Sequence, residues 1–389
     1  MPPQLLVSLF SLGNFVIGVA GFAIIGLLEP LGAEMGTSAA SAGQLLTVYA
    51  ISYALLSPLL VSLSGQIGRR RVLAAAIALV ALAAAVSALA PNMAVLNSAR
   101  IIAAAGAGLF TPIAAAVAAS LTPEANRAKV LAAVFFGLTL SQVLGVPAGS
   151  WIAYTFGWRW TFWLIFAMAL PLIWLIWTRV PAGLRFQPVS LKDLGQIIVK
   201  GRMMLAIMFT ASFLGSIYVL YTYIAPLLSE TMGYGRDGIS LMLLMFGLGA
   251  VGGNIMGGYL ADRLGWQRTL VGLCISQIIL MPVFSTLPLT TFLLALLSFS
   301  WALFGWAFMA GQQMRLITMA GAQAPVVLAL NAASIYIGAA IGSSIGGLVI
   351  AGFGISALGL AAGLAACGAL LHLLLSVRFA PQGAVAPLT

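Results

Sequence analysis

The sequence predicts an all-α membrane protein with twelve transmembrane helices in two pseudo-symmetric bundles of six. Three observations predict this fold class: an apolar composition, a series of apolar runs of spanning length, and an internal repeat. Of the 389 residues, 62% are hydrophobic and 6% are charged, whereas a soluble domain carries roughly 25% charged residues. Because so few charges cannot cover the surface of a soluble protein of this size, lipid must solvate much of the chain.

The apolar runs give the expected helices in chain order. A helix needs roughly 20 apolar residues to cross a bilayer. Twelve runs meet this requirement, at 5–28, 41–64, 72–90, 94–119, 129–155, 160–178, 203–229, 238–261, 268–287, 289–317, 325–353 and 356–377.

One gap between the runs is longer than the others and divides the chain. Residues 179–202 are polar and basic, so we expect them to lie on the membrane surface. The predicted organisation is an N-terminal six-helix bundle at 1–178, a cytoplasmic linker at 179–202, a C-terminal six-helix bundle at 203–378 and a C-terminal tail at 379–389.

The distribution of arginine and lysine predicts the orientation, because short loops rich in these residues stay in the cytoplasm. If both termini are cytoplasmic, the inner loops and helix ends hold fourteen of the 17 basic residues. The outer side then holds only Arg159 and Arg236, and Arg100 lies inside the fourth run. We therefore expect a multi-pass protein with both termini in the cytoplasm.

The two halves repeat when the sequence is shifted by 197 positions. Gly145 and Gly149 of the fifth run then fall on Gly342 and Gly346 of the eleventh. Small residues at this spacing share one helix face and let two backbones approach closely, so these glycines, together with Pro147, form a predicted helix-packing motif. A parallel repeat of two like-oriented halves is a hallmark of one large class of transporters.

Composition also argues against several other functions. The formal net charge is +10, but the basic residues lie in short gaps rather than in a stripe between aromatics, which argues against a nucleic-acid partner. The one histidine and two cysteines form no metal-binding pattern, so no metal or cofactor is expected. No pair of acids falls mid-span, which argues against a membrane-embedded enzyme, and the paired halves argue against a channel or receptor.

Several segments resemble motifs of the major facilitator superfamily. Residues 258–268, Gly-Tyr-Leu-Ala-Asp-Arg-Leu-Gly-Trp-Gln-Arg, are similar to its loop signature G-x-L-A-D-R-x-G-R-R. Residues 100–112 resemble its fourth-span motif with a membrane arginine. Residues 145–149, followed by Phe-Gly-Trp-Arg at 156–159, resemble its fifth-span antiporter motif and the loop after it. With the repeat, the resemblance covers nearly the whole chain.

This resemblance points to the drug:proton antiporter branch, near the arabinose-efflux-type exporters. It implies a secondary active transporter of the bacterial-type inner membrane, a monomer in the lipid bilayer. Such a protein exports a small organic molecule (drug, sugar or nucleoside-like) by alternating access, in exchange for protons. The alternative is a proton-independent facilitator or importer, because related exporters often hold a glutamate in the middle of span one, where this sequence has Gly21.

The loop signature also implies a conformational latch. An aspartate at the cytoplasmic end of a span can pair with arginines across the interface of the halves when the inner side is closed. Asp262 with Arg263 and Arg268 fits this role. In the first-half copy, Gly65 replaces the aspartate, which leaves Arg69 and Arg70 as the members of a weakened second latch. The alternative is a loop that only sets topology.

Two ionisable residues are candidates for proton coupling. Arg100 is costly inside a span, roughly 2.5 to 3.5 kcal/mol at the centre, and should either line a polar cavity or extend to the outer interface. Glu29 lies toward the outer end of span one, before Pro30. It is either reached from the cavity or is a solvated carboxylate at a helix end.

The substrate should contact the sparse polar and aromatic side chains that face a central cavity. Buried amides also serve as hydrogen-bonding links between helices, so for each residue both roles stay open. The candidates for the substrate cavity are Asn14, Tyr49, Tyr53, Arg100, Gln142, Tyr218, Tyr221, Asn254, Gln312, Gln313, Asn331 and Tyr336.

Overall fold

The computed structural model describes residues 3–123, 126–184 and 191–378, and every long element in these ranges is a helix. Eleven stretches are long and apolar enough to cross a membrane, and one of them, Arg236–Thr286, has 51 residues. A straight helix of that length would measure about 75 Å, more than twice the roughly 30 Å core of a bilayer. The stretch is broken at Gly265, whose φ of 76° and ψ of 157° are not helical. It therefore supplies two crossings, which makes twelve in the described residues.

The helices follow the predicted runs closely, with edges that differ by a few residues. The first and seventh crossings are longer than predicted, because each continues through a second short helix. The helices of the first half are α1 (Pro3–Phe22), α2 (Ile24–Met35), α3 (Ala39–Leu63), α4 (Arg69–Ala88), α5 (Met93–Ser120), α6 (Arg127–Leu140), α7 (Val146–Phe156) and α8 (Trp158–Arg179). The linker holds α9 (Leu191–Ile198), and the second half holds α10 (Gly201–Tyr221), α11 (Ile224–Met232), α12 (Arg236–Val283), α13 (Thr291–Trp306), α14 (Phe308–Ala320), α15 (Ala324–Phe353) and α16 (Leu358–Arg378).

Glycines with positive φ end corresponding helices in the two halves. Gly36 (φ 62°) ends α2 and Gly233 (φ 64°) ends α11. Gly157 (φ 98°) and Gly354 (φ 83°) follow α7 and α15. Residues other than glycine rarely adopt this left-handed conformation. Since each pair is separated by the shift of 197 positions, the sequence repeat is also a repeat of the backbone.

Several crossings are interrupted near the middle of the bundle. α1 gives way to α2 at Ala23, and α10 gives way to α11 at Thr222 and Tyr223. The fifth crossing contains a π-helical segment, Ser141–Gly145, between α6 and α7. Interrupted helices in corresponding positions of two repeats are the usual place for a transport site.

Within each bundle, small residues bring neighbouring helices into close contact. A Cβ atom added to Gly342 on α15 would lie 2.2 Å from the carbonyl oxygen of Gly215 on α10, and one added to Gly346 would lie 2.5 Å from that of Val219. In the first half, a Cβ atom on Gly145 would lie 2.3 Å from the Val19 side chain. The fifth and eleventh crossings thus lie directly on the first and seventh.

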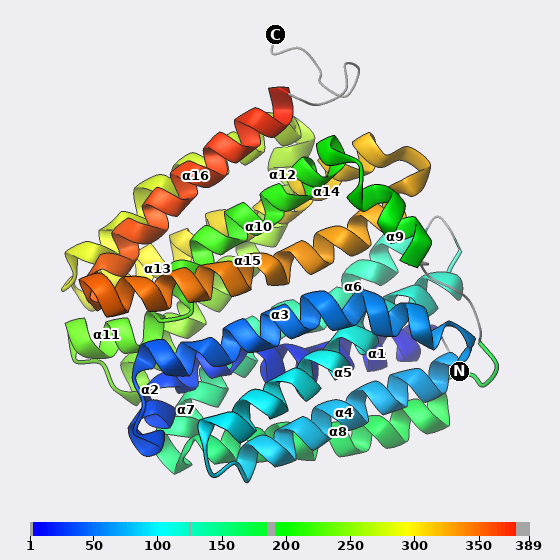
Figure 1. Cartoon of the computed structure of the whole chain (residues 1–389), viewed down its shortest axis with the longest axis horizontal. Helices are drawn as coiled ribbons and strands as arrows, with labels where there is room; N and C mark the ends of the chain where they lie inside the picture. The colour runs from blue at the N-terminus through cyan, green and yellow to red at the C-terminus, as the bar shows by residue number, and fades with distance from the viewer. Residues whose placement is uncertain (1–2, 124–125, 185–190, 379–389) are drawn as a thin grey trace.

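The two bundles meet along α3 with α15 and along α7 with α12. Figure 1 shows the first half in blue to green below the second half in green to red, with α2 and α11 together at the left. We call that end of the molecule the far end. The opposite end, at the right of Figure 1, holds α9 and the start of α1, and we call it the linker end. The sequence predicts that the linker end is cytoplasmic, and this orientation stays a prediction.

Candidate functional site

An aromatic cluster lies where the two halves meet beside the interrupted helices. Phe22 ends α1, Tyr49 and Tyr53 lie on α3, and Tyr218 and Tyr336 come from α10 and α15 of the other half. The rings of Tyr53 and Tyr336 stack with centroids 3.6 Å apart. The centroid of Phe22 lies 6.4 Å from those of both Tyr218 and Tyr336. Four of the five were predicted as cavity residues, and the structure brings them together across the interface.

Arg100 is buried beside this cluster, with a relative exposure of 2%. Its Nη1 donates to the carbonyl oxygen of Ala20 at 2.7 Å, and its Nη2 donates to that of Gly21 at 2.8 Å. The helix break at Ala23 interrupts the regular hydrogen bonding of these carbonyls, so the guanidinium satisfies backbone acceptors that α1 leaves open. The guanidinium carbon lies 4.6 Å from the ring centroid of Tyr49, in cation–π geometry. Arg100 does not extend to the outer interface.

A second pair of predicted residues links the halves at the next turn. The Tyr221 hydroxyl donates to Oε1 of Gln142 at 2.9 Å. Gln142 lies in the π-helical segment of the first half, and Tyr221 is the last residue of α10 in the second half. The Tyr221 ring stacks on Phe246 at 4.0 Å. The π-helical segment therefore turns a buried amide toward the partner bundle.

The remaining buried amides connect helices within one half. Asn14 donates to the Val134 carbonyl at 2.9 Å and accepts from Thr111 at 2.8 Å. Gln312 donates to the Ala206 carbonyl at 2.8 Å, and Asn331 accepts from Thr210. These bonds are the packing role that the sequence left open. Asn254 and Gln313 are exposed at the helix surface.

At the far end, Glu29 bridges the two halves. Its carboxylate accepts a hydrogen bond from the Tyr154 hydroxyl of α7 at 2.6 Å and one from the Ser229 hydroxyl of α11 at 2.8 Å. A further contact joins the halves between α3 and α15, where the hydroxyls of Thr47 and Ser343 lie 2.5 Å apart. Glu29 is half-buried rather than a solvated residue at a helix end.

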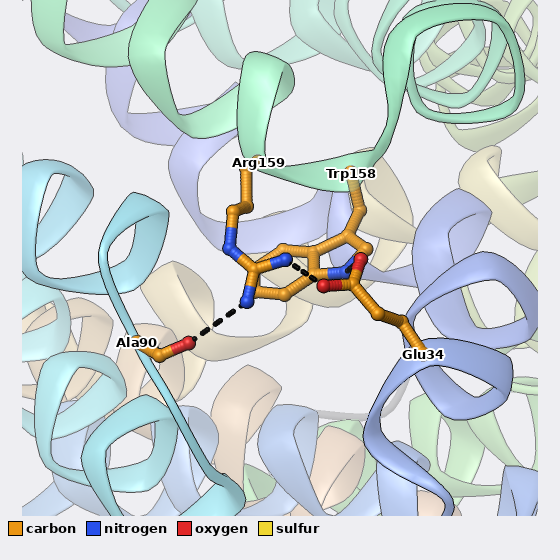
Figure 2. A network of polar contacts seen from close by, with 4 residues as sticks. All are labelled: Glu34, Ala90, Trp158 and Arg159. Carbon is orange, nitrogen blue, oxygen red and sulfur yellow. Dashed lines mark hydrogen bonds and ion pairs between the residues drawn. The ribbon is translucent and has the colours of Figure 1, made fainter.

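A polar network holds the end of α2 to its own bundle (Figure 2). Glu34 accepts a hydrogen bond from Nε1 of Trp158 at 2.8 Å and pairs with Arg159, both at the start of α8. Arg159 also donates to the carbonyl of Ala90 at 3.1 Å. This network connects the end of α2, the helix that carries Glu29, to the start of α8.

The predicted latch residues lie at the linker end. Asp262 and Arg263 are exposed, and Asp262 forms no ion pair within the part of the chain that the structure describes. Arg263 lies over the ring of Tyr259, at 4.5 Å, and Arg268 is exposed. In the first-half copy, Arg69 is fully buried and lies 3.4 Å from the carbonyl oxygens of Ser64 and Gly65.

The packing motif consists of glycines and Pro147. Their side chains carry no charge and no hydrogen-bonding group with which to bind a solute. Pro147 lies in the first turn of α7, where its missing N–H costs least. Gly149 would meet the Thr161 methyl at 3.2 Å if it carried a Cβ atom. Among the described residues, no cluster of histidine, cysteine, aspartate and glutamate could hold a metal ion.

Sequence reasoning missed several residues that the structure places at this site. Phe22 closes the aromatic cluster, and Tyr154, Ser229, Thr47 and Ser343 make the far-end contacts. Phe22 carried no signal because phenylalanine is common in membrane helices. Ser229 lies at the position equivalent to Gly32 under the shift of 197, but the shift does not indicate which residues of the two halves are in contact.

Comparisons with known proteins agree with this architecture. Residues 10–322 match the model of the Major Facilitator Superfamily. The chain is 30% identical to the inner membrane transport protein YdhP of Escherichia coli (strain K12), over 96% of each chain. It is 30% identical to a chloramphenicol resistance protein of Streptomyces lividans, over 66% of each chain. The crystal structure of a D-xylose-proton symporter superposes with a TM-score of 0.74 at 20% identity, over 98% of this chain and 99% of that one.

The family match covers most of the chain, and the superposition on the symporter extends over nearly the whole of both chains. Transport of small solutes across a membrane is the activity that this family shares. The chain is a multi-pass membrane transporter that belongs to the Major Facilitator Superfamily.

Proposed function

We propose that the protein exports a small organic molecule by alternating access, in exchange for protons. The observation that carries this proposal is the aromatic cluster, which both halves build beside their interrupted first and seventh crossings. A site shared by two rocking halves can face one side of the membrane and then the other. Similarity to a chloramphenicol resistance protein supports efflux as the direction.

The composition of the cluster favours a neutral or weakly cationic substrate with a flat apolar face. Tyrosine rings offer stacking surfaces and cation–π faces. The Tyr218 hydroxyl is buried and has no hydrogen-bond partner among the described residues, so it is available to a polar substituent. Arg100 already binds two carbonyls, which leaves it poorly placed to attract an anion. Drugs, sugars and nucleosides all meet this description.

The distribution of contacts supports a state that is closed at the far end. Glu29 with Ser229 and Thr47 with Ser343 join the halves there, whereas the predicted latch residue Asp262 forms no ion pair among the described residues. With the predicted orientation, such a state is closed toward the outside. The latch then forms after the halves rock and the cytoplasmic side closes.

Glu29 is the proposed proton-coupling residue because it connects charge to closure of the far end. As a carboxylate it accepts one hydroxyl from each half, and bonds to a charged acceptor are about twice as strong as neutral ones. A proton bound from outside removes that charge and weakens the bridge to Ser229. Protonation of Glu29 and closure of the far end are therefore linked, and exchange requires in addition that this proton leaves toward the cytoplasm once the far end has closed again.

The test is flux in proteoliposomes that carry an imposed pH gradient. For a neutral aromatic antibiotic such as chloramphenicol, wild-type protein is expected to drive accumulation that follows the gradient. Glu29→Gln should abolish the pH dependence, while Glu230→Gln, an exposed carboxylate of α11, should keep it. If flux of the wild type ignores the gradient at every pH, the alternative of a proton-independent facilitator or importer replaces the antiporter.

The remaining proposals concern topology and assembly. We propose residues 1–178 and 203–378 as the two moving bodies, with 179–202 as a cytoplasmic linker and 379–389 as a cytoplasmic tail of a monomer in a bacterial-type inner membrane. Reporter fusions at both termini test this orientation. A fusion active only on the outer side would reverse the proposed direction of transport.

A further inference from the structure

A cavity of about 130 Å³ lies at the linker end of the first half, away from the aromatic cluster. It is lined by Gly68, Arg70 and Arg71 at the start of α4 and by Ala182 and Gly183 in the turn after α8. Two of the five lining residues are arginines, and the other three are glycine or alanine, which leave room beside the guanidinium groups. The cavity is therefore small, open and positively charged.

The surrounding residues place this cavity at the edge of the membrane. The spanning stretch of α4 begins at Arg69 and that of α8 ends at Arg179. On α8, Trp174 and Trp177 are 62% and 49% exposed, and tryptophans gather where lipid headgroups meet the acyl chains. The Arg70 guanidinium lies 5.0 Å from the Trp177 ring. An arginine of the cavity thus contacts the aromatic belt that lipid molecules cover.

The charge of the cavity has no internal counterpart in the described residues. The two ion pairs that the structure describes, Arg159 with Glu34 and Arg236 with Asp237, both lie toward the far end. Neither Arg70 nor Arg71 forms an ion pair there. Guanidinium groups bind phosphate oxygens through paired hydrogen bonds, and the start of α4, a helix of 20 residues, adds the positive end of its dipole.

We propose that this cavity binds the phosphate group of an anionic phospholipid such as phosphatidylglycerol. Basic pockets at the ends of membrane helices are suited to such headgroups. Binding has a mechanical consequence, because the Arg69 amide donates to the Leu184 carbonyl at 3.0 Å. A lipid phosphate between Arg70, Arg71 and the turn at 182–183 fastens the start of the linker to the first bundle. This proposal is independent of the substrate and of proton coupling.

The test measures thermal stability of the full-length protein in detergent during titration with short-chain phosphatidylglycerol. The wild type should be stabilised by phosphatidylglycerol and not by phosphatidylcholine of the same chain length. Arg70→Gln with Arg71→Gln should weaken apparent binding on the order of tenfold or more, since each basic residue near a membrane surface contributes about 1 kcal/mol. The matched control, Arg202→Gln with Arg378→Gln, removes two linker-end arginines outside the cavity and should bind as the wild type does.

A second variant distinguishes lipid binding in the cavity from a general effect of positive charge and from misfolding. Ala182→Phe fills the cavity and leaves every arginine in place, so it should also lose the effect of phosphatidylglycerol. Equal weakening by the cavity pair and the control pair would overturn the proposal, as would undiminished binding to Ala182→Phe. Stabilisation by inorganic phosphate to the same extent as by the lipid would keep the phosphate site and overturn its assignment to a lipid.

Discussion

Replacing Arg100 tests whether a buried charge holds the interrupted first crossing together. In the structure the guanidinium makes two short hydrogen bonds to the carbonyls of Ala20 and Gly21, and it covers the Tyr49 ring. Arg100→Met keeps most of the side-chain volume and removes every donor. Arg100→Lys keeps the charge but loses the planar fork that reaches both carbonyls at once.

The expected loss of unfolding free energy distinguishes two possibilities, namely that these bonds contribute as neutral hydrogen bonds do or as bonds from a charged donor do. Hydrogen bonds between neutral groups of membrane helices contribute ~0.6 kcal/mol on average, so two of them would amount to roughly 1 kcal/mol. Bonds to a charged donor contribute ~1.5–3 kcal/mol each. An arginine is also unfavourable in the unfolded, membrane-inserted chain. That cost destabilises the unfolded state, so it does not reduce the stability that these bonds give to the folded state. We therefore expect Arg100→Met to lower the free energy of unfolding by about 3 kcal/mol or more, and Arg100→Lys by about half as much.

The assay is reversible unfolding in mixed micelles, followed by circular dichroism. The control is Arg236→Ala, which removes an exposed pair with Asp237 and should leave the unfolding midpoint unchanged. Arg100→Met should also abolish transport, because the break between α1 and α2 loses its support. A loss of about 1 kcal/mol or less, or equal effects of the Met and Lys variants, would refute the view that the charge stabilises the break.

Three further changes probe other parts of the molecule. Gly342→Ala would place a methyl group 2.2 Å from a carbonyl oxygen of α10 and should cost roughly 1–3 kcal/mol of stability, whereas Gly272→Ala on open surface should be tolerated in the same unfolding assay. Asp262→Asn should shift the population toward the state open at the linker end, read from labelling of introduced cysteines; an unchanged labelling pattern removes Asp262 from the mechanism. Tyr336→Ala should weaken substrate binding about fivefold through loss of one aromatic contact, and Tyr259→Ala on the surface should not; equal binding constants would remove the cluster from the substrate path.

The positions of the crossings were predictable because lipid imposes a simple rule on sequence. Every spanning helix must satisfy its backbone internally and expose apolar side chains, so length and hydropathy alone locate it. The repeat was predictable for a similar reason, since positions such as Gly145 and Gly342 leave no room for a side chain against the neighbouring helix. The connection at Gly265 is so short that the two helices it joins form one continuous apolar stretch, and only its glycine and the adjacent charges divide it.

The composition of the site was less predictable, because hydropathy does not fix the rotation of a helix. Asn14 and Asn254 look alike in sequence, yet one is fully buried between three helices and the other is exposed. Likewise, nothing local to Ser229 indicates that it lies beside Glu29 of the other half. Such contacts depend on how two bundles are placed against each other, which is a property of the whole interface.

The replacement of the span-one glutamate by Gly21 has a structural explanation that bears on proton coupling. A Cβ atom at Gly21 would lie 3.0 Å from the Tyr49 hydroxyl, so a longer side chain would have to displace that ring from beneath Arg100. The Gly21 carbonyl instead accepts a hydrogen bond from Arg100. A backbone oxygen thus accepts the bond that a carboxylate could accept, but it does not take up a proton. A protonatable group on the first crossing must then lie elsewhere, and Glu29 is two turns, roughly 12 Å, closer to the far end. The proposed coupling through Glu29 would therefore act on closure of the far end rather than on the charge of the aromatic cluster.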